Sequence, residues 1–171
     1  LGLRGILTTE NELHDQLRDA CFREAQGVIL SHALTAGGLA LVPVPAVDLP
    51  ALLAVQARMC HKLASVYHQE LNTRGVAELF GALGTGVFLR MGGRELLKLI
   101  PGAGSFVAAA YAAGMTYALG LTLSAYFSRV KDGAVPDAEE FREMYRKYSR
   151  IGEERMRDYF RRAPQQETPK Q

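Results

Sequence analysis

Four histidines and two cysteines are the side chains of this sequence best suited to bind a metal ion or act as nucleophiles. His61 and His68 are seven residues apart, a spacing that would place both on one helix face, with Cys60 or Glu70 as the nearest further ligand. No standard zinc spacing is present, so we predict packing or surface roles for these histidines. We expect Cys21 and Cys60 to be small buried apolar residues in a reducing compartment.

Two glycine-rich segments, residues 81–86 and 102–105, have the composition of phosphate-binding loops. A P-loop also needs a preceding strand and a lysine before serine or threonine, and neither segment has them. We interpret both as helix-packing or helix-start segments, although the amides of residues 105–107 would point the positive end of a helix at an anion. We therefore predict a non-enzymatic protein with no cofactor and no metal ion.

Asp48 is the carboxylate that stands out, because it follows Pro43 and Pro45 in an apolar stretch. As the cap of a helix with Pro50 in its first turn, it would accept hydrogen bonds from free backbone amides. The alternative is a buried ion pair with one of three cations, Arg58, Arg94 or Lys98.

The charges are distributed unevenly along the 171 residues. The net charge is only +2, and no basic run is interleaved with aromatic residues, so we expect no nucleic acid partner. Residues 25–128 contain only ten charged side chains, and residues 99–128 contain none. This centre is therefore predicted to bury apolar surface, while the charged flanks face water.

Helical periodicity and proline breaks predict an all-α fold. A capping box at residues 9–12 opens a first helix that residues 42–45 must end, and helices over 49–71, 74–91, 94–100 and 105–129 follow. Leu52, Val55, Met59, Leu63 and Val66 form the apolar stripe of the helix over 49–71. The breaks at Pro43 and Pro101 make two proline-broken apolar hairpins, flanked by an N-terminal and a C-terminal amphipathic helix.

The C-terminal amphipathic helix is predicted over residues 137–162, opened by Asp137-x-x-Glu140. Its expected inner stripe is Phe141, Met144, Tyr145, Tyr148, Ile151, Arg155 and Tyr159. Residues 163–171 form a polar tail that we expect to be disordered. We predict one helical domain over residues 1–162 with its apolar core at residues 25–129.

Residues 105–129 are apolar on every side and long enough to raise the question of a membrane span. Small and hydroxyl residues outnumber the large aliphatic ones, and Ala110-x-x-x-Gly114 and Gly120-x-x-x-Ser124 would let another helix approach closely. Burial in lipid and burial against other helices both remain open.

Several motifs together resemble the YcjF-like domain of unknown function over residues 25–129. They are Val42-Pro43-Val44-Pro45-Ala46-Val47-Asp48, Leu53-x-x-Gln56-x-x-Met59, Lys98-Leu99-Ile100-Pro101-Gly102-x-Gly104, Thr116-Tyr117-Ala118-Leu119-Gly120 and Tyr126-Phe127. That domain is found C-terminal to bacterial Era-like or dynamin-like GTPase domains. The resemblance implies a GTPase partner and the cytoplasmic membrane, and it carries over no catalytic residue.

The first hypothesis is a non-enzymatic helical module that couples to a GTPase domain, in cis or in trans, on the cytoplasmic side of the inner membrane. The alternatives are a cytoplasmic helical interaction domain and a protein that binds lipid or a small molecule. Membrane lipid and a second copy, joined through helix packing, are the other expected partners.

The chain does not start with methionine, so we expect it to be part of a longer protein. The interaction candidates are Pro43, Pro45, Asp48, Gln56, Lys98, Pro101, Gly102 and Gly104.

Overall fold

The computed structural model describes residues 2–41, 48–84 and 104–162. Within these ranges the chain forms five helices and no strand, which confirms the predicted all-α class. The helices are α1 (Gly2–Leu41), α2 (Asp48–Val66), α3 (Thr73–Leu83), α6 (Gly104–Lys131) and α7 (Ala138–Arg162).

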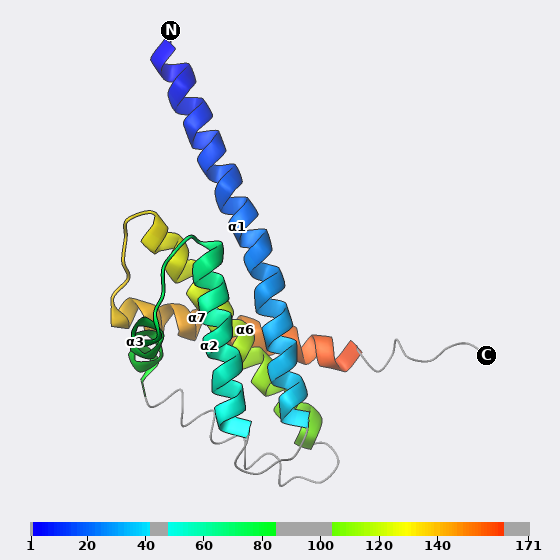
Figure 1. Ribbon diagram of the computed structural model, residues 1–171. Coiled ribbons are helices and arrows are strands. Elements are labelled where there is room, and N and C mark those ends of the chain that lie inside the picture. The colour runs from blue at the N-terminus through cyan, green and yellow to red at the C-terminus, as the bar shows by residue number, and fades with distance from the viewer. Residues whose placement is uncertain (1, 42–47, 85–103, 163–171) are drawn as a thin grey trace, which may run out of the picture.

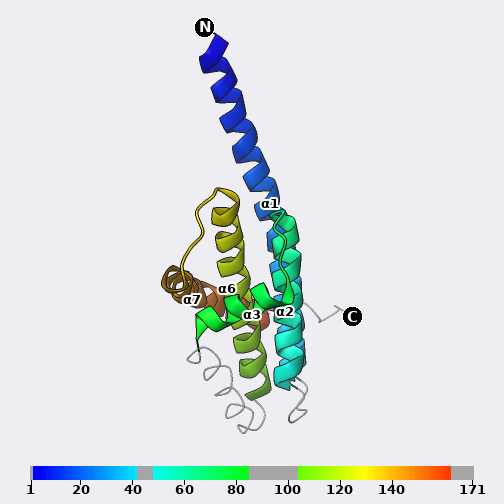
Figure 2. The ribbon, with the colours of Figure 1, turned by 60° about the vertical axis from the view of Figure 1, so that its left-hand side comes forward.

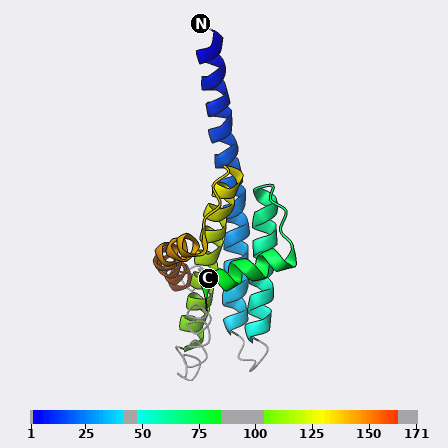
Figure 3. The ribbon, with the colours of Figure 1, turned by 90° about the vertical axis from the view of Figure 1, so that its left-hand side faces the viewer.

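Three of the helices, α1, α2 and α6, lie side by side and form the body of the molecule (Figure 1). Helix α7 runs across this body and packs mainly on α6, and the short α3 lies against α7 and α2 (Figure 2). The N-terminal half of α1 projects beyond the other helices as an arm (Figure 3). The last turns of α1 and the first turns of α2 and α6 meet at the end opposite this arm.

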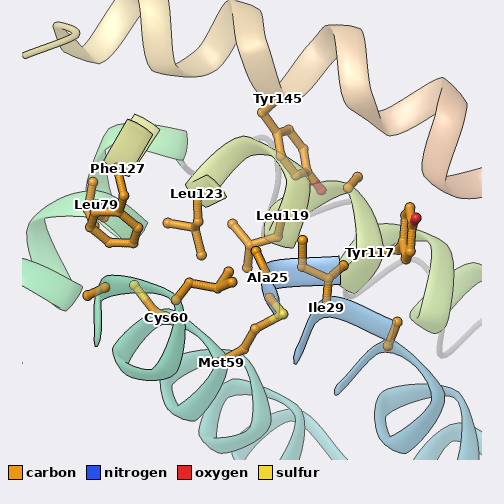
Figure 4. Packing of buried hydrophobic residues seen from close by; sticks show 14 of the residues in the cluster. Ala25, Ile29, Met59, Cys60, Leu79, Tyr117, Leu119, Leu123, Phe127 and Tyr145 are labelled. Carbon is orange, nitrogen blue, oxygen red and sulfur yellow. The ribbon is translucent and has the colours of Figure 1, made fainter. Parts of the chain in front are cut away.

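The core is built from apolar side chains of all five helices, as Figure 4 shows for its centre. Leu52, Met59, Leu63 and Val66 are buried as the α2 stripe predicts, and Val55 is partly buried. The arm behaves differently, because Leu13 and Leu17 are 56% and 51% exposed although they continue the stripe that is buried from Cys21 onward. The apolar stripe of α1 is therefore longer than the body that covers it.

Local hydrogen bonds fix the helix ends near residues 68 and 133. The amides of His68 and Gln69 donate to the carbonyls of Ser65 and Ala64, which closes α2 in a Schellman motif with His68 at φ 57°. Gly133 ends α6 in the same way at φ 82°, where a residue without Cβ is favoured. The predicted box at the start of α7 is confirmed, because Asp137 Oδ1 accepts from the amides of Glu139 (2.8 Å) and Glu140 (2.9 Å).

Three predicted helix limits are wrong. Helix α1 begins at Gly2, seven residues before Thr9, because nothing in that leucine-containing stretch stops a helix. Helix α2 ends at Val66 and not near residue 71, since the Schellman motif closes it first. Helix α3 ends at Leu83, where Gly84 at φ 76° donates to the carbonyl of Gly81, and it does not continue to residue 91.

The two predicted hairpins differ in what the structure describes. The arms of the first, α1 and α2, pack together as expected. Residues 42–47, the predicted helix over 94–100, the break at Pro101 and the tail over 163–171 lie outside the described residues. The described part of the second hairpin is α6 and the shortened α3, and α3 packs on α7 and α2.

Glycines bring the helices of the body into close contact. A Cβ on Gly120 would lie 2.7 Å from Ile29 Cγ1, and a Cβ on Gly114 would lie 2.9 Å from the Cα of Glu153. A Cβ on Gly152 would overlap the carbonyl oxygen of Gly114. The small-residue pairs of α6 therefore do permit close approach, to α1 at one glycine and to α7 at the other.

Candidate functional site

The eight interaction candidates divide into three groups. Five lie outside the described residues, namely Pro43, Pro45, Lys98, Pro101 and Gly102. Asp48 and Gly104 are the first residues of α2 and α6, as expected for residues that start helices, and only their backbone is described. The proposed ion pair of Asp48 is therefore outside the description, and Arg58 is exposed. Gln56 is the candidate whose side chain can be followed.

Gln56 is fully buried between α2 and α6. Its Nε2 donates to Thr116 Oγ1 at 3.2 Å, and its Oε1 has no hydrogen-bond partner among the described residues. A buried polar atom without a partner destabilises the fold by about 1–3 kcal/mol. Gln56 therefore joins two helices through one bond while leaving an acceptor unused.

Two further hydrogen bonds join α6 to its neighbours. The hydroxyl groups of Tyr67 and Ser124 are 2.5 Å apart, and Tyr117 donates to Gln26 Oε1 at 3.1 Å. Sequence reasoning used Ser124 as a small residue and Tyr117 as part of a motif, and it missed their partners. The available signal was the placement of hydroxyl groups within an uncharged helix, because a buried hydroxyl group needs a partner.

Within the described part of the chain, the cysteines and histidines form no metal-binding group. Cys21 and Cys60 are buried free thiols, as predicted, and burial raises the pKa of Cys60 to about 12. His68 lies beyond the end of α2, so the prediction that it shares a helix face with His61 is wrong. The described residues contain no group of three histidine, cysteine or acidic side chains close enough for a metal ion.

Helix α6 is long and apolar enough over Phe106–Lys131 to cross a membrane. In the described structure 72% of its most apolar window is buried by the protein itself, as in the core helix of a soluble domain. The hydroxyl groups of Thr116, Tyr117 and Ser124 bond to Gln56, Gln26 and Tyr67, and that of Thr122 donates to the carbonyl of Ala118 within α6. Length and composition alone therefore do not make α6 a single membrane span.

A cleft of about 470 Å³ lies between the first turns of α6 and the C-terminal half of α7. Most of its wall is apolar, and Phe106 and Val107 are 55% and 52% exposed there. Two cations and one acid line the α7 side, namely Arg157, Arg161 and Glu153. No local sequence pattern predicts this cleft, because its two walls come from helices that meet only in the folded chain.

The charges divide the helical body into two ends. We call the last turns of α1, the first turns of α2 and the first turns of α6 the charge-poor end. From Gly27 to Leu41 and from Gly104 to Ser128 there is no charged residue, and α2 has only Asp48 before Arg58. The opposite end carries the charged arm of α1 and the ion pair of Arg18 with Asp132 (3.8 Å). Among the described residues, a charge-poor end with exposed Leu41, Phe106 and Val107 is unusual for a surface that faces only water.

A comparison with models of protein families shows to which family the chain belongs. Residues 8–150 match the model of a domain of unknown function, DUF697. The chain belongs to this family. The match extends beyond the predicted 25–129 on both sides and includes α1 from residue 8 and the first half of α7.

One curated relative of this DUF697 domain is a membrane protein by its name. It is the Magnetosome membrane protein 22 of Magnetospirillum gryphiswaldense, which is 30% identical over 133 residues, covering 71% of this chain and 67% of the relative. No solved structure matches the chain.

Proposed function

We propose that this domain is a non-enzymatic helical module that binds the cytoplasmic face of the inner membrane through its charge-poor end and couples a GTPase domain, in cis or in trans, to that membrane. The observation that carries the membrane part is the separation of charge along the described body, with exposed Leu41, Phe106 and Val107 at the charge-poor end. The relative named as a magnetosome membrane protein supports the same environment.

The position of α7 suggests how deep the charge-poor end enters the bilayer. Helix α7 crosses α6 where Gly152 meets Gly114, ten residues after α6 begins at Gly104. At 1.5 Å per residue, about 15 Å of α6 lies beyond this crossing. That length is about half of the ~30 Å hydrocarbon core, so the end would enter one leaflet.

The composition of α7 fits the boundary between water and lipid. One face packs on α6 through Phe141, Tyr145 and Met156, and the other carries charges of both signs. The charged exposed face suits water and lipid head groups, because the apolar face is already covered by α6. In this arrangement α7 marks the membrane surface, and the arm of α1 points away from it into water (Figure 1).

The arm of α1 is the surface that we assign to the GTPase domain. Leu13 and Leu17 are each more than half exposed on this N-terminal half of α1. Because α1 continues from the arm to the charge-poor end without a break, a domain bound to the arm would be held rigidly relative to the membrane. The resemblance to domains that follow Era-like GTPases motivates this step.

Flotation with liposomes tests the membrane part. Replacing Leu41 by glutamate places a charge at the charge-poor end, and we expect vesicle binding to fall at least about tenfold, because burying one leucine is worth about 1.5–3 kcal/mol. Val135→Glu is the matched control, since Val135 is 68% exposed in the turn at the other end of α6. Equal binding by both variants would contradict the proposed orientation.

A nucleotide experiment tests the GTPase part. The natural polypeptide that contains this domain, or a mixture with its GTPase, is floated with a non-hydrolysable GTP analogue and with GDP. We expect the bound fraction to differ between the nucleotides, and the double variant Leu13→Asp/Leu17→Asp to abolish the difference while still binding vesicles. No nucleotide effect in the wild type would refute the coupling.

The burial of α6 favours a second candidate, a helical interaction domain that works in water. With 72% of its most apolar window covered, α6 needs no lipid to be stable. A chain that stays folded and monodisperse without detergent, and that fails to float with any vesicle, would establish this alternative and remove the membrane proposal.

A further inference from the structure

We propose that the cleft between α6 and α7 binds an acidic phospholipid, whose phosphate contacts Arg157 and Arg161 and whose acyl chain lies against Phe106 and Val107. This inference rests on the proposed function, because the lipid reaches the cleft from the membrane at the charge-poor end. It goes beyond that function by naming a ligand class and a site.

The cleft has the volume and the apolar lining to hold an acyl chain. Its volume of about 470 Å³ lies within the range of small-molecule pockets. Phe106, Val107 and Ala110 line it from α6, and Phe160 lines it from α7. Phe106 and Val107 are more than half exposed, whereas the next residues of α6, from Ala108 onward, are largely buried. Water therefore meets apolar surface that an acyl chain could cover.

The charges at the cleft favour an anionic head group. Arg157 and Arg161 are one helical turn apart, so they project from the same side of α7. Neither guanidinium forms an ion pair within the described residues, whereas Arg142 and Arg146, near the start of the same helix, both bind Glu139 (2.6 and 2.8 Å).

Among the described lining residues Glu153 is the one acid beside two arginines, so their summed charge is positive. Guanidinium groups bind phosphate oxygens through two parallel hydrogen bonds, which makes a phosphate group the complementary ligand.

The level of the cleft agrees with the proposed depth of insertion. Its α6 wall lies between Gly104 and Gly114, on the charge-poor side of the crossing with α7. Its arginines lie on α7, which we place at the membrane surface. A lipid in this site would keep its phosphate at the level of the other head groups and its acyl chain in the hydrocarbon core.

Vesicles of two compositions test the proposal. We expect the full chain to bind vesicles that contain phosphatidylglycerol more tightly than pure phosphatidylcholine vesicles, and the double variant Arg157→Gln/Arg161→Gln to lose at least about fivefold on the acidic vesicles only. The control is Arg23→Gln/Arg58→Gln, which removes the same charge from exposed positions on α1 and α2. Equal losses in both double variants would overturn the site, because only general attraction would remain.

A titration in solution separates this site from the proposed membrane function. Dihexanoyl phosphatidylglycerol, below its micelle concentration, is added to the chain and binding is measured by calorimetry. We expect binding that weakens at least about tenfold in Arg157→Gln/Arg161→Gln and in Ala110→Trp, which fills the cleft without changing charge.

Each outcome of the two experiments decides one proposal. Vesicle binding without any heat from the short-chain lipid would refute the cleft and keep the membrane module. Heat without vesicle binding would keep the cleft and refute the module. Wild-type affinity in both cleft variants, with circular dichroism unchanged, would also overturn the assignment.

Discussion

Gly152 is the position where a single methyl group should disturb the fold most. A Cβ there would overlap the carbonyl oxygen of Gly114 and lie 3.0 Å from the amide nitrogen of Ala118. Both are backbone atoms of α6, so no side-chain rotation can relieve the contact and the two helices must move apart. Overpacking of this kind destabilises by about 1–3 kcal/mol. The gain in helix propensity from glycine to alanine is about 1 kcal/mol. Taking the upper end of the first range, we expect Gly152→Ala to lower the free energy of unfolding by about 2 kcal/mol.

Gly38→Ala is the matched control for this measurement. A Cβ on Gly38 has no neighbouring atom within 4 Å, and the residue lies inside α1. It should therefore gain up to about 1 kcal/mol, as should Gly27→Ala. Urea unfolding followed by circular dichroism measures all three variants at constant slope. If Gly152→Ala were as stable as Gly38→Ala, then α6 and α7 could not cross at the described distance, and the depth argument for the membrane would fail with it.

Four other substitutions test the interior and one helix end. Gln56→Leu should leave the free energy of unfolding unchanged or raise it, because it removes a buried acceptor without a partner. Thr116→Val should lower that free energy by about 1–2 kcal/mol, because the amide of Gln56 loses its partner. Urea unfolding of both variants and of the double variant checks these values.

Burial raises the pKa of Cys60 from 9.0 to about 12, so above pH 9 the folded state holds a proton that the unfolded state loses. The free energy of unfolding should therefore fall by up to about 1.4 kcal/mol per pH unit above pH 9. Cys60→Ala should lack this slope when urea unfolding is measured between pH 8 and 10. Asp137→Ala should cost about 1 kcal/mol, seen as a lower melting temperature, because two amides of α7 lose their acceptor.

Features that depend on local chemistry could be predicted from the sequence. The cap at Asp137 and the cap at Asn72, whose Oδ1 accepts from the amide of Gly75 at 2.8 Å, each involve residues three apart or fewer. The α2 stripe follows the helical period and needs only one apolar side to face the body. The all-α class follows from the same periods and from the absence of alternating patterns.

Features that depend on how helices meet could not be predicted. The inner stripe of α7 was expected to include Ile151, Arg155 and Tyr159, but all three are exposed. Gly152 and Met156 are buried in their place. Hydrophobicity favours isoleucine over glycine at a buried position, yet the backbone contact with Gly114 requires glycine. A pattern that weighs side chains by apolarity cannot find a contact made where a side chain is missing.

The candidate site shows the same division. Gln56 and Thr116 both belong to quoted motifs, but they are sixty residues apart and nothing in the sequence pairs them. The cleft could not be found at all, because Phe106 and Arg157 come together only when the Gly114–Gly152 crossing sets the position of α7. The geometry of that crossing is therefore what creates the proposed lipid site.

The burial of α6 limits how this domain can use a membrane. If α6 crossed the bilayer alone, Thr116, Tyr117 and Ser124 would leave partners on α1 and α2 for lipid, where unpaired polar groups are costly. Keeping those bonds requires α1, α2 and α6 to enter together. Since α1 and α6 carry charges beyond their uncharged stretches, only the charge-poor end can enter. If the domain binds a membrane, contact through one end of the intact body keeps the hydrogen bonds of the core and leaves the charged arm in water.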